Sequence, residues 1–193
     1  MVISQTNYGS IIFAKVLRVK PGSGSAADRL AIVTLQDIET LEEYKMLCWN
    51  SQHENGSMLS DRARKLVFGE FITARVRFDI GDERKCTCYE MKKRGIYKTA
   101  GEDGIQYVIC GKVAKATIGN NIYCLMIPSD SYTNAGKTTH WYQVNFWNNS
   151  SIEAREKIKK GDIVCIRCYN LKERIYNGFS YKELTGTYFK AGA

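Results

Sequence analysis

The segment HWYQVNFWN, from His140 to Asn148, has the residue pattern of a half-buried β-strand. Side chains alternate between the two faces of a strand, so Tyr142, Val144 and Phe146 would share one apolar face, suited to a core. The opposite face would carry two indoles and two amides, from Trp141, Gln143, Asn145 and Trp147. Tryptophan is highly buried on average, so two tryptophans among polar side chains on a solvent-facing surface indicate a binding site.

This strand belongs to an internal repeat that organises the whole chain. The matching segments, in chain order, are SIIFAKVLRV (from Ser10) with YVICGKVAKA (from Tyr107), YKMLCWN (from Tyr44) with YQVNFWN (from Tyr142), ARKLVFGEFITARV (from Ala63) with AREKIKKGDIVCIRC (from Ala154), and GIYKTAG (from Gly95) with GTYFKAG (from Gly186). Because the order is the same in both halves, we predict two homologous domains, residues 1–99 and 104–193, joined near Thr99–Gly104.

Each half is predicted to run strand, strand, strand, helix, strand, strand. In the second half the strands are expected over residues 106–117, 121–128, 140–148, 162–176 and 179–189. Ser150 and Glu153 have the spacing of a capping box at the helix start, and Asn177-Gly178 is a strong signal for a tight hairpin. Five strands with a helix between the third and fourth is the order of the OB-fold, a small barrel that often binds oligonucleotides. We therefore predict an all-β protein of two tandem OB-fold five-stranded barrels.

The composition favours a polyanionic partner. The 193 residues carry a formal net charge of +8, with a pI near 9.1, and a basic balance suits nucleic acid. The longest apolar stretches are strand-sized, well short of the ~20 residues that a membrane-spanning helix needs. The first residues lack a basic segment followed by an apolar run, so no secretory signal is expected. We expect a cytoplasmic protein with no membrane partner.

Seven cysteines raise the question of metal binding, because Cys86 and Cys88 have C-x-C spacing and Cys165 and Cys168 have C-x-x-C spacing. The latter two lie in a predicted strand, where residues three apart point to opposite faces and cannot share a metal. We expect free thiols, no metal and no cofactor. The two histidines lack metal-ligand spacing, and no Walker, G-x-S-x-G or paired-carboxylate pattern occurs, so we expect no catalytic activity.

The fourth and fifth strands of the second half add cations and rings to the candidate surface. Alternation places Lys172, Arg174 and Tyr176 on one face. Across the tight turn, Tyr176 would pair with Phe179, and Arg174 would pair with Tyr181. Cations can contact phosphates while rings stack on bases. The alternative is a solvated hairpin whose aromatic side chains pack on each other.

The segment SDSYTNAGKTT, residues 129–139, is expected to be a flexible polar loop between strands two and three of the second half. It contains Tyr132 and Lys137, which could fold over a bound strand. An ordinary exposed loop is the alternative.

The second half resembles the bacterial single-stranded-DNA-binding protein family, through WYQVNFWN, the helix after it and KKGDIVCIRCYNLKERIY. In that family a few aromatic side chains stack on bases. The matching positions are aromatic here too: Trp141, Trp147, Tyr132 and Tyr176. The resemblance implies that these four residues bind single-stranded DNA by stacking.

The chain departs from the family pattern in three ways. The arm between strands four and five is cut to a tight Asn-Gly turn, where the family often has a long one. The C-terminal segment TGTYFKAGA lacks the acidic tail through which the family recruits replication partners, so that recruitment is not expected. Two barrels occupy one chain, as in the tandem-barrel members of the family, and this implies a homodimer.

The first domain is predicted to be the weaker binder. The face that matches the aromatic and amide positions of the second domain reads Glu43, Lys45, Leu47 and Trp49. Acidic residues near this strand should repel phosphate: Asp37, Glu39, Glu42 and Glu43. Arg75 and Arg77 on the fourth strand could still guide a nucleic-acid backbone by charge. Alternatively, this domain mainly acts as a scaffold or dimerises.

Together these patterns predict a sequence-independent single-stranded-DNA-binding protein that acts by base stacking and phosphate contacts in replication, recombination or mobile-element transfer. Two alternatives stay open. One is an RNA-binding OB-fold protein, and the other is a protein-interaction or structural module whose aromatic face is an interface.

Overall fold

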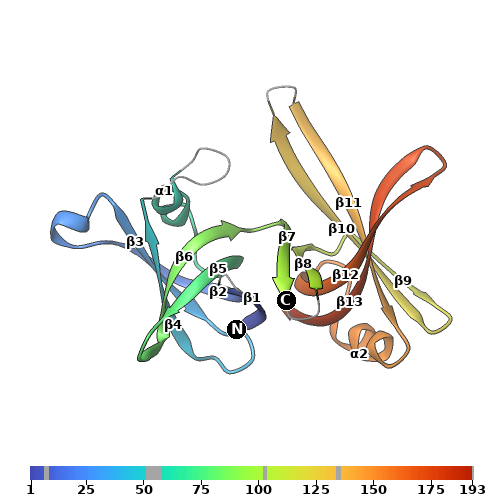
Figure 1. Cartoon of the computed structure of the whole chain (residues 1–193), viewed down its shortest axis with the longest axis horizontal. Coiled ribbons are helices and arrows are strands. Elements are labelled where there is room, and N and C mark those ends of the chain that lie inside the picture. Colours follow the sequence, from blue (N-terminus) through green and yellow to red (C-terminus); the bar gives the residue numbers. More distant parts are fainter. Residues whose placement is uncertain (7–8, 51–57, 102–103, 134–135, 193) are drawn as a thin grey trace. The chain divides into compact units, whose positions relative to one another are not determined.

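The computed structural model describes residues 1–6, 9–50, 58–101, 104–133 and 136–192 of the chain (Figure 1). These residues form mainly strands, with two short α-helices and one 3₁₀ turn among them. The chain divides into two compact units, Met1–Lys92 and Lys93–Ala193, and each unit has its own sheet and core. The prediction of a mostly β protein is therefore confirmed.

The first unit contains a closed barrel of five strands. Its elements are β1 (Val2–Thr6), β2 (Gly9–Pro21), η1 (Gly24–Ala26), β3 (Leu30–Gln36), β4 (Glu43–Trp49), α1 (Leu59–Arg64), β5 (Phe71–Asp79) and β6 (Asp82–Lys92). The strands are hydrogen-bonded in the order β1-β2-β3-β4-β6-β5, and β2 also pairs with β5. This additional pairing closes the barrel, and β1 is an extra strand paired with β2.

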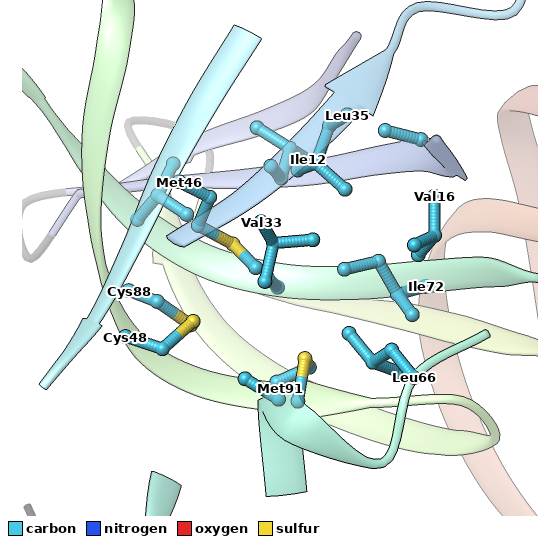
Figure 2. Packing of buried hydrophobic residues seen from close by; sticks show 14 of the residues in the cluster. Ile12, Val16, Val33, Leu35, Met46, Cys48, Leu66, Ile72, Cys88 and Met91 are labelled. Carbon is cyan, nitrogen blue, oxygen red and sulfur yellow. The ribbon is translucent and has the colours of Figure 1, made fainter. Parts of the chain in front are cut away.

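Apolar side chains from every strand of this barrel fill its interior (Figure 2). Ile12, Val33, Met46, Ile72 and Met91 lie in one buried cluster, and each comes from a different strand. The helix α1 adds its buried side to the same cluster. Burying a side chain of this size is worth about 1.5–3 kcal/mol, so the inward positions of the strands hold the barrel together.

The second unit is a seven-stranded sheet. Its elements are β7 (Gly95–Gly101), β8 (Gly104–Lys112), β9 (Lys115–Gly119), β10 (Ile122–Thr133), β11 (Gly136–Trp147), α2 (Asn149–Lys157), β12 (Ile163–Tyr176) and β13 (Phe179–Gly192). The strand order is β7-β8-β12-β13-β11-β10-β9. Two long hairpins, β10–β11 and β12–β13, extend from this sheet (Figure 1). Ala154 and Ile158, at the helix and just after it, are buried in its core.

The two sheets follow the same pairing scheme except in their first long strand. β2 pairs with β5 and then with β3, and it changes partner near a bulge between Val16 and Arg18. In the second unit β8 pairs with β12 and β9 pairs with β10, with Val113 and Ala114 between them. The repeat aligns Val16 with Val113, so this split lies where β2 changes partner. Within the described residues no strand pairing closes the second sheet, whereas the sequence predicts a second closed barrel.

The repeat is also visible where the helix leads into the next strand. Ala63 in α1 and Ala154 in α2 are both fully buried, as their alignment requires. Gly69 and Gly161 follow the helices with φ of +87° and +102°, a backbone region that favours glycine. In both units, therefore, a buried alanine in the helix and a glycine after it mark the passage from the helix to the next strand.

The change from one unit to the next lies before the joint that the sequence suggests. Residues 95–99 were expected to end the first domain, but β7 pairs along its length with β8 of the second sheet. β7 is to β8 what β1 is to β2: an extra strand ahead of the five that the repeat predicts. The sequence assigns residues 95–99 to the first domain because GIYKTAG resembles GTYFKAG, and this similarity does not show which strand the segment pairs with.

The segment 129–139 is not the loop that its polar composition suggests. β10 continues to Thr133 and β11 begins at Gly136, so this segment forms the outer part of a long hairpin. Ser131 lies opposite Thr138, and Asp130 lies opposite Thr139. Threonine and tyrosine favour strands, and both faces of a projecting hairpin can be polar because both are solvated. Residues 134–135, between these two strands in the sequence, lie outside the described residues.

The predicted capping box is wrong. Asn148 is the N-cap of α2, so Ser150 lies inside the first turn instead of preceding it. Ser151 donates a hydrogen bond from Oγ to the carbonyl oxygen of Asn148 over 2.6 Å, and no side chain caps the helix N-terminus. The strand β11 runs directly into the helix through the positive φ of Asn148, which asparagine tolerates.

Candidate nucleic-acid interface

β11 has the two faces that its sequence predicts. Tyr142, Val144 and Phe146 are buried in the core of the second unit. On the other face Trp141 is half-buried and Trp147 is 46% exposed. Both indoles therefore stay outside the core, and the predicted direction of each face is confirmed.

A groove lies on the outward face of this sheet. It has a volume of about 490 Å³ and is lined by Ala114, Lys115, Thr117, Cys124, Met126, Trp141, Gln143 and Phe179. Small-molecule sites in proteins commonly have volumes of ~300–1,000 Å³. The ring of Trp141 on β11 lies 6.2 Å from that of Phe179 on β13, at an interplanar angle of 55°. Two aromatic rings from different strands thus line this groove.

A chain of hydrogen bonds runs beside the groove across three strands. Gln143 donates from Nε2 to Oδ1 of Asn145 over 3.0 Å. Asn145 donates from Nδ2 to Oε1 of Glu183 over 3.1 Å. Arg174 donates from Nε to Oε2 of the same carboxylate over 2.7 Å, and this ion pair raises the pKa of Arg174. The two amides are consequently held in fixed orientations, and Asn145 is buried although it faces outward.

Glu183 is the residue of this surface that sequence reasoning missed. It lies opposite Gln143 on β11 and opposite Lys172 on β12, at the centre of the outward face. The signal was present, because Glu183 has the same parity as Tyr181 along β13. Its carboxylate changes the electrostatics of the surface, since the charge of Arg174 is offset within the protein.

The hairpin β12–β13 has the geometry that its sequence predicts. Tyr176 pairs with Phe179 and Arg174 pairs with Tyr181. Asn177 and Gly178 between them have φ of 49° and 76°, as a two-residue turn with two positive φ values requires. The two rings beside the turn have different surroundings. Tyr176 is 70% exposed, whereas the ring of Phe179 contacts that of Trp141.

The cations of the second unit differ in what they contact. Lys137 forms an ion pair with Asp130 over 3.0 Å. Asp130 also accepts a 2.7 Å hydrogen bond from Oγ1 of Thr139, and that bond, together with Lys137, lowers the pKa of Asp130. Lys115 and Lys172 are exposed and have no carboxylate within salt-bridge distance in the described part of the chain. Lys115 lines the groove, and Lys172 lies opposite Glu183 of the hydrogen-bonded series. Both place a positive charge there that no carboxylate in the described residues offsets at close range.

Tyr132, a predicted site residue, and His140 also belong to the β10–β11 hairpin. The backbone of Tyr132 lies opposite Lys137, and its side chain lies outside the described residues. His140, next to Trp141, is half-buried with Nε2 3.0 Å from Oγ of Ser131. The imidazole of His140 thus has a hydrogen-bond partner within the hairpin itself.

The first unit presents a different surface at the corresponding place. Glu43 and Lys45 are exposed on β4, Leu47 is half-buried, and Trp49 is 43% exposed. The single ring of Trp49 is therefore on the outside, as the sequence predicts.

Several charged residues that the sequence singles out in the first unit contact neighbouring side chains. Arg75 lies 3.5 Å from Glu90, and Arg77 lies 6.0 Å from the ring centroid of Tyr89. Glu42, expected to repel phosphate, forms a 3.0 Å ion pair with Arg84.

Asp37, the first acidic residue expected to repel phosphate, does not reach the surface. It is buried, pairs with the α-amino group of Met1 and accepts hydrogen bonds from the backbone of Glu39 and Thr40. The expectation of phosphate repulsion therefore does not apply to this carboxylate.

The described residues contain no cluster of histidine, cysteine and acidic side chains that could hold a metal ion. Cys168 lies in the core cluster with Val164 and Ile166, whereas Cys165 does not belong to that cluster, as the alternation of β12 predicts. Six of the seven free cysteines are buried and Cys124 in the groove is half-buried. Burial raises the pKa of Cys86 to about 12, so this thiol is inert in the folded protein.

None of the described helices is long and apolar enough to cross a bilayer.

Comparisons with known proteins give structural likenesses only. No protein-family model matches the chain, and no curated protein matches its sequence. The chain is similar to the single-stranded DNA-binding protein of Thermus aquaticus, with 14% identity over 95% of this chain and 91% of that one and a TM-score of 0.32. It is similar to the small single-stranded DNA-binding protein of Streptomyces coelicolor, with 10% identity over 51% of this chain and 84% of that one and a TM-score of 0.27.

A third similar structure is a murine DNA-binding protein bound to double-stranded DNA. Its identity is 14% over 94% of both chains, and its TM-score is 0.29. At such TM-scores a likeness does not establish a shared function, so the function of this chain is argued from its own groove and charges.

Proposed function

We propose that the chain binds single-stranded DNA without catalysing a reaction, and that each unit is an OB-fold. The strand order supports the fold proposal. In both units the first, second, third, fifth and fourth long strands follow each other across the sheet, with a helix between the third and fourth. The split of the first strand into β8 and β9 is the departure of the second unit from that scheme. This order is that of a Greek-key barrel which often binds oligonucleotides.

The observation that carries the function is the groove lined by Trp141 and Phe179, with Trp147 exposed on the same face of β11. A stacked base is worth about 1–3 kcal/mol, and stacking tolerates any base because each has a π-face. Lys115 and Lys172 supply positive charge beside these rings for the phosphates. Binding is therefore expected to be nearly independent of sequence and to weaken steeply with salt.

The second unit is the main binding unit in this proposal. Its outward face combines rings, oriented amides and free lysines, whereas the face of β4 retains one tryptophan among charged residues. The first unit contributes charge or assembly. We place the protein in the cytoplasm, as a homodimer acting in replication, recombination or mobile-element transfer.

Titration with oligo-dT of graded lengths at two salt concentrations tests the proposal, with tryptophan emission as the signal. Quenching of emission, and an affinity that falls linearly with the logarithm of salt concentration, are the expected results. An oligo-dT that fails to bind at low salt would refute the function.

Competition distinguishes the alternatives. Matched RNA and double-stranded DNA are added to the preformed complex, and the displaced oligo-dT is measured. Equal or stronger competition by either would assign the groove to that nucleic acid instead. Size measurement with and without oligo-dT adds a second check, because an interface between subunits covering Trp141 would exclude DNA from the groove.

A further inference from the structure

A second concavity lies on the same unit, away from the groove. It has a volume of about 420 Å³ and is lined by Ile105, Gln106, Arg167, Cys168, Tyr169, Asn170 and Thr187. We call it the β12 cavity. It shares no lining residue with the groove, and it lies on β8, β12 and β13. Neither the aromatic pattern of β11 nor the Asn-Gly hairpin points to it.

The strand register places this cavity on the outward face that carries the groove. Asn145 on β11 lies opposite Thr185 on β13, and Thr185 lies opposite Tyr169 on β12. Directly paired residues project to the same side of a sheet, so Tyr169 faces outward as Asn145 does. Adjacent strands are ~4.8 Å apart, which separates β11 from β12 by about 10 Å. The groove and the β12 cavity are thus neighbouring depressions along one face.

A bulge opens the sheet at the β12 cavity. The pairing of β12 with β13 shifts between Tyr169 and Lys172, and Asn170 within the shift has a φ of +55°. A bulge leaves a residue unpaired and redirects the side chains around it. Tyr169, at the edge of this irregularity, is 40% exposed although it sits in the middle of a long strand. Tyr169 therefore presents an aromatic ring to the outside directly beside the bulge.

Arg167 gives the cavity positive charge. Its guanidinium lies 5.7 Å from the ring centroid of Tyr188. In the part of the chain that the structure describes, no carboxylate lies within salt-bridge distance of Arg167, in contrast to Arg174 and its partner Glu183. A guanidinium resting on an aromatic ring keeps its donors for another acceptor, and phosphate is the ligand that its planar geometry fits well.

We propose that the β12 cavity is a second nucleotide subsite, in which a base stacks on Tyr169 and Arg167 holds the adjacent phosphate. The occupant belongs to the same strand that stacks on Trp141, so this inference rests on the proposed function. The amides of Gln106 and Asn170 line the cavity and supply polar contacts beside the ring. The strand crosses the sheet from the groove over Asn145 and Thr185 to Tyr169.

Tyr169→Ala tests the subsite by titration with oligo-dT of graded lengths. Short oligomers that fill only the groove should bind the variant and the wild type equally. Longer oligomers should bind the variant about tenfold more weakly, the size expected for one stacked base. Tyr169→Phe keeps the ring and should restore binding. Ile175→Ala, at a residue 78% exposed on the other face of β12, is the matched control and should bind as the wild type does.

Arg167→Ala provides an independent reading of the same subsite. With long oligomers, the slope of log affinity against log salt concentration should fall by the amount expected for about one phosphate contact. With short oligomers the slope should not change.

The outcomes separate this inference from the proposed function. Tyr169→Ala that matches wild type at every length, while Trp141→Ala binds more weakly, would overturn the subsite and leave the function intact. An equal loss at all lengths would also overturn it, because Tyr169 would then support the groove instead of binding a base. A wild-type protein that binds no oligo-dT would overturn both.

Discussion

The third strands of the two units, β4 and β11, occupy the same place in the pairing scheme but present different surfaces. Inward, both carry an apolar set: Tyr44, Met46 and Cys48 in β4, and Tyr142, Val144 and Phe146 in β11. Outward, β11 carries two tryptophans and two amides, whereas β4 carries two charged residues, a leucine and one tryptophan. The inward positions maintain the core, and the outward positions are free to differ.

Charge pairing sharpens the contrast. In the second unit, Lys115 and Lys172 beside the rings have no carboxylate partner among the described residues. In the first unit, Arg75 and Arg84 are paired with Glu90 and Glu42. Exposed pairs contribute little to stability, so their main effect is on the field that a polyanion meets. Lys115 and Lys172 therefore present positive charge without a carboxylate partner among the described residues, whereas Arg75 and Arg84 are each offset by a neighbouring glutamate.

The largest expected effect concerns the inward face. Phe146→Ala should lower the free energy of unfolding of the second unit by about 3–5 kcal/mol, because it leaves a cavity beside Phe189, whose ring lies 5.6 Å away. Cys48→Ala, at the matching position of β4, removes one atom and should cost roughly 1 kcal/mol. Urea denaturation of both variants measures the difference. Equal losses of unfolding free energy in the two variants would contradict the alignment of Cys48 with Phe146.

The next effect concerns the rings on the outward face. Trp141→Ala and Trp147→Ala should each weaken oligo-dT binding by about 1–3 kcal/mol, because each removes a stacking surface. Trp49→Ala, at the position of β4 that matches Trp147, is the control and should change affinity little. Titration by anisotropy avoids dependence on the tryptophan signal. A loss at Trp49 as large as that at Trp147 would mean that both units stack bases.

Glu183→Gln should strengthen binding, by roughly 1 kcal/mol or less. The substitution keeps a hydrogen-bond acceptor for Asn145 but removes the negative charge that offsets Arg174. The slope of log affinity against log salt concentration should then become steeper by the amount expected for about one phosphate contact. Glu42→Gln frees Arg84 in the first unit in the same way and should have no such effect. Similar gains from both would show that charge in either unit attracts DNA equally.

The smallest effect concerns the half-buried thiol of the groove. Burial first, and then the charge of Glu183, raise the pKa of Cys124 above its ordinary 9.0. Alkylation needs the thiolate, so its rate should be low near neutral pH and rise as the pH approaches that raised pKa. Mass spectrometry should show Cys124 modified before the buried cysteines. Bound oligo-dT should slow the reaction, and unchanged alkylation would place DNA elsewhere.

Alternation and the repeat were enough to predict the long strands, their order and the two faces of β11. They could not predict that β1 and β7 pair with β2 and β8, because the residues of a strand do not identify its partner. They also could not show that residues 129–139 extend a hairpin, since a solvated hairpin and a loop have the same polar composition. The split of the first strand at Val113 depends on which neighbour each half pairs with.

The aromatic part of the candidate site could be predicted, and its electrostatic part could not. Parity along one strand brings Trp141 and Trp147 to one face, and the Asn-Gly turn brings Arg174 opposite Tyr181. The contact of Arg174 with Glu183 and of Glu183 with Asn145 depends on how β11, β13 and β12 align across the sheet. That alignment joins residues far apart in the chain, so local patterns do not contain it.

The placement of β7 determines where the chain can be divided. A cut after Lys92 leaves each fragment with all of its strands, because β7 remains hydrogen-bonded to β8. A cut between Thr99 and Gly104 would strip that edge and expose unpaired amide and carbonyl groups along β8, which are a template for association with other chains. A fragment that begins at residue 93 therefore keeps β8 paired on both sides, as it is in the full chain.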